Sequence, residues 1–242
     1  MNSKGSVPSK PSRPKMTPSA LMRLAGLSAV AAGLGFIIIG LFHPENVPAS
    51  VTTATWANVH IVATAMGFFG LLGMAGLYAR QVGKIGWLGL AGFVMFSIWL
   101  ALIMVFSFVE AFILPLLAAE SPAFVAGFLG MFTGIAGEID LGILPTLWQV
   151  SGPLFIVGPL LFAIATFRAG VLPRGAAGLQ ALGAVLIPAG AFLPPAYEPL
   201  VMVPVGLALG WLGYALFAER RVETTGATLE HSMATPERSQ AA

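Results

Sequence analysis

Two histidines and one glutamate are the side chains of this sequence that are best suited to binding chemistry. His43 follows an apolar run, His60 lies at the start of the next, and Glu110 lies near the end of a third. Imidazole nitrogens and carboxylate oxygens are ligands for zinc, iron and manganese. If the fold brings the three residues together, they form a candidate site for a divalent metal ion.

Glu110 is the most informative of these residues, because apolar sequence follows it as well as precedes it. A carboxyl group in such a position favours a proton or a cationic partner. The alternative is a side chain that reaches the water of the head-group layer. Trp56 lies four residues before His60, and hence on the same face of a helix. Trp56, Glu138 and Asp140 are added to the candidate site as accessory residues.

Other chemistry finds little support in the sequence. No HExxH zinc motif, phosphate-binding glycine loop or nucleophile elbow is present. The absence of cysteine excludes disulfides, thiolate metal sites and iron–sulfur clusters. A haem held by His43 and His60 is an alternative, although the short loop between them leaves little room for a porphyrin. The simplest alternative is that these side chains close helix ends by hydrogen bonds.

The composition is that of a membrane protein. Of 242 residues, 57% are hydrophobic and only 9% are charged, and the mean hydropathy is +0.88. Soluble domains carry about 25% charged residues. The 29 glycines and 18 prolines agree with this class, because both are commoner in membrane helices than in soluble ones. The basic residues flank the apolar runs, so the lipid bilayer rather than nucleic acid is the expected partner.

The pattern of apolar runs predicts an all-α, polytopic membrane helix bundle with six transmembrane helices. Residues 1–19 and 219–242 are polar and are predicted to be disordered tails on either side of a transmembrane domain, residues 20–218. The six predicted spans are residues 24–42, 57–79, 85–113, 144–167, 176–192 and 200–218.

The positive charges predict the orientation of these spans. If the first span starts in the cytoplasm, all 12 Lys and Arg residues lie on that side. Such a bias sets membrane topology. We therefore expect a multi-pass protein of the cell (inner) membrane with both termini in the cytoplasm. The histidines and Glu110 are then carried to the outer side.

The stretch from Ser121 to Gly137 could overturn this topology. It is uncharged over 17 residues, at the short end of the spanning range. A seventh span would move Arg168 and Arg174 to the outer side. We favour an extra interfacial or re-entrant helix between the third and fourth spans, with Ser121 as N-cap and Pro122 in the first turn.

Regularly spaced glycines predict where helices pack closely, because small residues let backbones approach in lipid. The predicted packing faces comprise Gly26, Gly33 and Gly40 on the first span, Gly67, Gly70, Gly73 and Gly76 on the second, and Gly206 with Gly210 on the sixth.

Several motifs resemble those of uncharacterised bacterial six-helix membrane proteins. They include His43-Pro44-Glu45 followed by Trp56 and His60, and the segments 76–81, 109–112, 168–174 and 211–214. The resemblance covers residues 20–218. It implies a six-helix membrane protein in which His43, His60 and Glu110 belong to a recurring pattern, and it implies no particular activity.

We therefore expect a non-enzymatic membrane protein: a subunit of a membrane assembly, or a binder of lipid or a small molecule, with an outward-facing His/carboxylate cluster. A metal-dependent or haem-type redox enzyme acting at the outer face is the alternative. A transporter is the second alternative, disfavoured because no charged residue or histidine falls at mid-membrane depth.

Overall fold

The computed structural model describes residues 16–135, 137–194 and 196–233, with side chains described as far as Ala218. The predicted N-terminal tail lies mostly outside these residues. The described chain is helical and has no strand, which confirms the all-α prediction. Its elements are α1 Pro18–Phe42, η1 Pro48–Ser50, α2 Ala54–Phe108, η2 Val109–Ile113, α3 Leu114–Glu120, α4 Pro122–Thr133, α5 Leu144–Ala169, α6 Arg174–Leu186, η3 Ile187–Phe192, η4 Glu198–Met202 and α7 Val203–Met233.

Five helical segments of the described chain are long and apolar enough to cross a membrane. This agrees with a transmembrane protein. The segments are residues 18–42, 54–120, 144–169, 174–192 and 198–218.

The longest segment is broken at Gly86. This residue has φ 63° and ψ −171°, a backbone conformation that side chains other than glycine rarely adopt. The two halves of α2, residues 54–85 and 87–108, fold back on each other. A Cβ on Gly67 would meet Leu100 and Met104, and one on Gly70 would meet Leu100. The break therefore converts one continuous run into an antiparallel pair.

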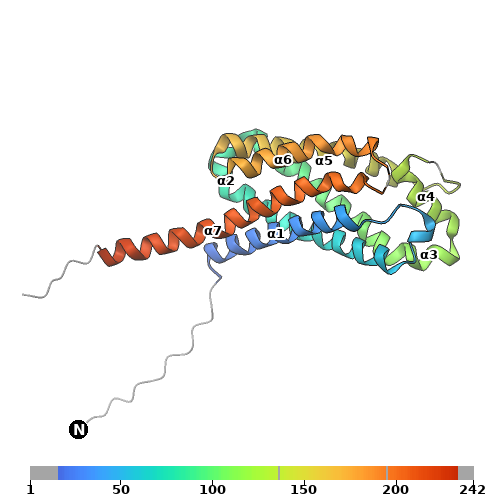
Figure 1. Ribbon diagram of the computed structural model, residues 1–242, viewed down its shortest axis with the longest axis horizontal. Coiled ribbons are helices and arrows are strands. Elements are labelled where there is room, and N and C mark those ends of the chain that lie inside the picture. Colours follow the sequence, from blue (N-terminus) through green and yellow to red (C-terminus); the bar gives the residue numbers. More distant parts are fainter. Residues whose placement is uncertain (1–15, 136, 195, 234–242) are drawn as a thin grey trace, which may run out of the picture.

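The helices form a closed ring in which each packs against two neighbours. α1 packs on α2 and α7, the second half of α2 packs on α5, and α6 lies between α5 and α7. At one end of the ring lie the α1–α2 loop, α3 and α4, and at the other end lie the turn at Gly86 and the α5–α6 connection (Figure 1).

The predicted glycine faces are among the places where the helices approach most closely. A Cβ on Gly33 would lie 2.5 Å from the backbone oxygen of Gly206, and Gly26 meets the backbone of Gly213 in the same way. Gly210 differs, because a Cβ there would meet nothing within 4 Å. The glycines of α1 thus form a packing face, as predicted, and the structure shows that the partner helix is α7. Gly210 contributes through its backbone alone.

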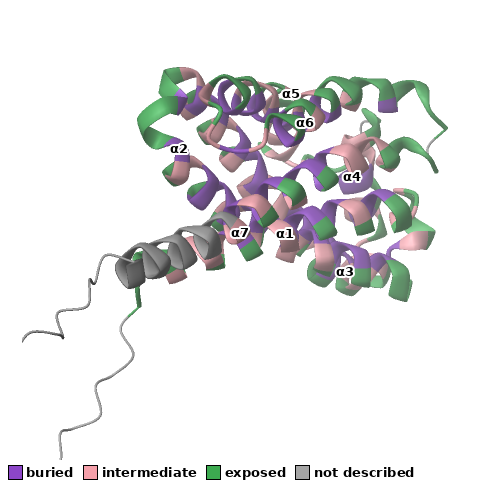
Figure 2. Ribbon diagram, turned by 60° about the vertical axis from the view of Figure 1, so that its left-hand side comes forward, coloured by how far each residue is buried: buried purple, intermediate pink, exposed green. Residues whose placement is uncertain are grey.

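Buried residues line the faces where helices meet (Figure 2). In the centre, Trp99 stacks on Phe155 with ring centroids 3.8 Å apart, and Phe36 stacks on both rings. A second cluster lies towards the α3–α4 end and combines Val51, Trp56, Phe106, Leu114, Val125, Phe128 and Leu129.

The helix predicted after Ser121 is α4. It begins at Pro122, as expected, but the Ser121 side chain does not cap it. It ends at Gly134, which has φ 74°; the Ile135 amide then donates to Gly130 O at 2.8 Å. With 12 residues, α4 is shorter than the roughly 20 residues that a crossing requires.

Candidate functional site

His43 stands directly after α1, at the point where the following proline ends the helix. Pro44 disfavours helical backbone at the residue before it, and His43 has ψ 120°. Its Nδ1 lies 2.7 Å from the backbone oxygen of Pro44. A carbonyl oxygen can only accept, so Nδ1 carries the proton and Nε2 keeps its lone pair.

The His60 ring is held by a bond of the same kind. Thr53 caps α2, with its hydroxyl accepting from the Trp56 amide at 3.2 Å. This start places Trp56 and His60 one turn apart, with ring centroids separated by 4.1 Å. Nδ1 of His60 donates to Trp56 O at 2.8 Å. Its Nε2 is buried without a hydrogen-bond partner.

Glu110 lies in a π-helical turn, and the sequence supplies a cause for that turn. Pro115 has no amide hydrogen, and its ring conflicts with the carbonyl four residues earlier. The amide of Leu114 accordingly donates to Val109 O, five residues back. The backbone oxygen of Glu110 then has no backbone donor, because the Leu114 amide already donates to Val109 O and Pro115 has no amide hydrogen. Single π turns of this kind occur often at functional sites.

Trp56 supplies the missing donor. Its indole Nε1 donates to Glu110 O at 2.8 Å, across 54 residues of sequence. The indole is fully buried and packs in the second hydrophobic cluster beside Leu114. Trp56 therefore helps to position Glu110 beside His60, and it is not a lipid-facing anchor.

These elements bring the three predicted residues together. Nε2 of His60 lies 3.4 Å from Oε2 of Glu110, and the His43 and His60 rings meet edge to face with centroids 5.1 Å apart. His60 is 1% exposed and Glu110 is 5% exposed. The cluster thus pairs a buried imidazole nitrogen with a buried carboxyl group.

His43 is uncharged at neutral pH. Burial, reinforced by the neighbouring His60, lowers the pKa of His43 from 6.5 to about 4, and its hydrogen bond to Pro44 only partly opposes this. His43 therefore presents an unprotonated Nε2 at neutral pH, as metal binding would require.

The side chains do not yet form a complete set of metal ligands. Among the described residues, no three His, Cys, Asp or Glu side chains are placed so that they could hold one ion. The third histidine, His231, lies where side chains are not described.

The accessory carboxylates are not part of the cluster. Glu138 and Asp140 are exposed in the loop between α4 and α5. Asp140 accepts from the Gly142 amide at 2.8 Å and so shapes its own turn.

Asn46 is a polar residue that was not predicted to belong to the site. Its Oδ1 is buried without a hydrogen-bond partner in the α1–α2 loop. Asparagine is common in turns, and only its position just after His43-Pro44-Glu45 could have drawn attention to it.

The ring packing also bears on the haem alternative. His43 and His60 contact each other, and Trp56 lies beside both, with ring centroids 4.1 Å and 6.4 Å away. The two imidazoles are thus in direct contact, and a porphyrin plane does not fit between them as they stand.

The function of this arrangement has to be argued from its own geometry. Comparison with protein-family models, curated proteins and solved structures finds no match for the chain.

Proposed function

We propose that this chain is a non-enzymatic, six-crossing membrane protein that binds a divalent metal ion, zinc in the first instance, through His60, Glu110 and His43. The break at Gly86 supports this crossing count, because it folds α2 into two antiparallel halves. If each half crosses the membrane, the five apolar segments give six crossings. Both ends of the chain then lie on the same side.

The orientation follows from charge. With six crossings, Arg80 and Lys84 at the turn of α2 share a side with Arg168 and Arg174 between α5 and α6. Lys and Arg favour the cytoplasmic side. The His/Glu cluster then lies towards the outer side of the cell membrane, and α4 is an interfacial or re-entrant helix there.

The observation that carries the metal proposal is the relation between His60 and Glu110. Two ligands of a tetrahedral ion with zinc–ligand distances of about 2.0–2.1 Å lie about 3.3–3.4 Å apart. The Nε2 and Oε2 atoms are separated by 3.4 Å. This spacing suits two ligands of one ion, and it is long for a direct charge-assisted hydrogen bond.

The surroundings of both histidines agree with metal binding. Each donates its Nδ1 proton to a backbone carbonyl, His60 to Trp56 and His43 to Pro44. Metal-binding histidines usually make such a bond, because it fixes the tautomer and aims the other nitrogen. His60 Nε2 is buried without a hydrogen-bond partner, so no other group of the described chain competes with a cation for it.

His43 is the proposed third ligand, and it must turn to reach the ion. Its ring already touches that of His60, so a movement of the short segment after α1 is sufficient. Water completes the coordination, as at other sites with three protein ligands. The pair His60–Glu110 is thus preformed, and His43 closes on it.

Metal analysis of the purified chain tests this proposal. Wild-type protein in mild detergent, stripped with chelator and returned to zinc, is expected to bind one equivalent. His60→Ala and Glu110→Gln should each reduce affinity by at least tenfold, and His43→Ala by a smaller factor. Isothermal titration with zinc measures all four proteins.

Glu45→Gln is the matched control, since Glu45 is an exposed carboxylate in the same loop. It should bind zinc like the wild type. Equal binding by His60→Ala and wild type, or no binding by a folded wild type, would overturn the proposal.

A second candidate rests on the incomplete ligand set. Because no third ligand is in place among the described side chains, the pair could act without metal as a polar clamp between the halves of α2, in a subunit of a larger membrane assembly. Glu110→Gln would then lower thermal stability equally in chelator and in zinc. Metal binding predicts that zinc stabilises the wild type and not this variant.

A further inference from the structure

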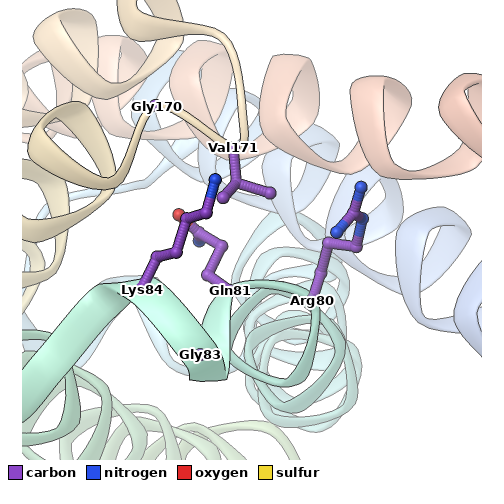
Figure 3. Close-up of a pocket in the computed structure, with 6 residues that line it drawn as sticks. All are labelled: Arg80, Gln81, Gly83, Lys84, Gly170 and Val171. Atoms are coloured by element: carbon purple, nitrogen blue, oxygen red, sulfur yellow. The ribbon is translucent and has the colours of Figure 1, made fainter.

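A polar pocket lies at the end of the bundle opposite the His/Glu cluster. Its volume is about 420 Å³, within the range of ligand-binding pockets. It is lined by Arg80, Gln81, Gly83, Lys84, Gly170 and Val171 (Figure 3).

Two glycine turns create the pocket. α2 reverses at Gly86, and α5 ends at Gly170, which has φ 61°. Both conformations favour glycine. The last turn before the α2 reversal and the short α5–α6 connection therefore face each other without a helix between them, and the lining side chains occupy this opening.

Gln81 is the residue that points to a ligand. It is 1% exposed, and its Nε2 donates to Leu77 O at 3.1 Å and to Thr166 Oγ1 at 3.3 Å. Since a carbonyl can only accept, these bonds fix the amide orientation. Oε1 is left buried with no donor. Figure 3 shows the Gln81 amide extending into the pocket on the side of Lys84. Such an acceptor is costly unless a donor reaches it.

The pocket is also positively charged. Lys84 is exposed, lies one turn after Gln81 and rises from α2 on the opposite side of Val171 from Arg80 (Figure 3). Arg174 lies near the pocket, with its guanidinium 3.2 Å from where a Cβ on Gly170 would be, but its Nε donates to Phe167 O. Among the described residues, the lining includes no carboxylate. The pocket therefore offers the Lys84 ammonium for an anion and one acceptor for a hydroxyl.

We propose that this pocket binds the head group of an anionic phospholipid that carries a free hydroxyl, as in phosphatidylglycerol. Lys84 contacts the phosphate, and Oε1 of Gln81 accepts from the hydroxyl. This inference uses the membrane embedding proposed above but is independent of the metal site.

The position of the pocket favours a lipid over a soluble phosphate ester. Trp87 follows the lining segment directly and is 85% exposed, and tryptophan is enriched at the membrane interface. Basic pockets between membrane helices on the cytoplasmic side are suited to lipid phosphates. An acyl chain can run from this opening along the apolar outer surface of α2.

Thermal unfolding of the full chain in uncharged detergent tests the inference. Dioctanoyl phosphatidylglycerol is expected to raise the midpoint in a saturable way, and dioctanoyl phosphatidylcholine is not. Lys84→Gln should weaken the apparent affinity at least tenfold. Gln81→Leu should bind phosphatidylglycerol no better than phosphatidic acid, which has the phosphate without the hydroxyl.

Arg168→Gln is the matched control, because Arg168 is an exposed cation of the same region that does not line the pocket. It should respond like the wild type. Equal effects of Lys84→Gln and Arg168→Gln would overturn the site, as would equal stabilisation by both lipids. Saturable protection by glycerol 3-phosphate as strong as that by the lipid would overturn the lipid assignment. Because Lys84 is exposed, its variant tests the idea even if Gln81→Leu does not fold.

Discussion

The indole of Trp56 donates to the backbone oxygen of Glu110 at 2.8 Å, and this bond links the first turn of α2 to the π turn that follows it. It satisfies a carbonyl that Pro115 leaves without a backbone donor. The bond therefore fixes Glu110 beside His60, and one proline determines both the irregular turn and the need for the tryptophan.

Replacing Trp56 with phenylalanine should destabilise the protein. The ring would still fill the cluster, but a buried carbonyl would lose its donor, which costs about 1–3 kcal/mol. Thermal or denaturant unfolding in detergent measures the loss. Trp87→Phe is the control and should change little, since Trp87 is 85% exposed. A stability of Trp56→Phe equal to that of wild type would show that the bond contributes nothing.

Pro115→Ala should weaken the dependence on Trp56. Alanine restores an amide hydrogen, so the helix can give Glu110 O a backbone partner. The cost of Trp56→Phe should then be smaller by about 1 kcal/mol in the Pro115→Ala background, as a double-mutant cycle would show. Strictly additive effects of the two substitutions would contradict the link between Pro115 and the π turn.

Gly33→Ala should separate α1 from α7. Alanine favours helix by about 1 kcal/mol over glycine, but a Cβ on Gly33 would lie 2.5 Å from the backbone oxygen of Gly206. Overpacking against backbone costs about 1–3 kcal/mol, so we expect a net loss of stability. Gly210→Ala, where a Cβ meets nothing within 4 Å, should be neutral or stabilising. Thermal unfolding in detergent measures both variants, and a lower midpoint for Gly210→Ala than for Gly33→Ala would refute this packing.

Acidification should destabilise the protein partly through His43. Its pKa is lowered from 6.5 to about 4 in the folded chain, so between these values the unfolded state binds more protons. The contribution of His43 to the free energy of unfolding is then fully present above pH 6.5, and it is lost as the pH drops towards 4. His43→Gln should remove this part of the pH dependence. Parallel pH profiles for wild type and variant would contradict the shift.

Single-cysteine labelling tests the orientation, since the chain has no native cysteine. Ala49→Cys, exposed in the α1–α2 loop, should react with a membrane-impermeant maleimide in intact cells. Arg168→Cys, at the other end of the bundle, should react only after permeabilisation. Labelling of Arg168→Cys in intact cells would refute the proposed sidedness and place the His/Glu cluster in the cytoplasm.

The sequence by itself determined the helical class and several of the glycine faces at which helices pack. Apolar runs of spanning length predicted the helices, since their backbone groups need partners within the segment. The spacing of Gly26 and Gly33 predicted a close interface, since only small residues allow it. The choice of His43, His60 and Glu110 as neighbours also came from their places at segment ends.

Tertiary structure alone decided the chemistry that these residues can perform. The orientation of the His60 ring depends on a bond to Trp56 O, and the place of Glu110 depends on a proline five residues later and a tryptophan 54 residues earlier. The unpartnered oxygen of Gln81 likewise depends on Thr166 from another helix. Hydrophobic periodicity predicts which face of a helix is buried. It does not predict which polar atoms meet there, because hydrogen bonds depend on side-chain positions at the scale of tenths of an ångström.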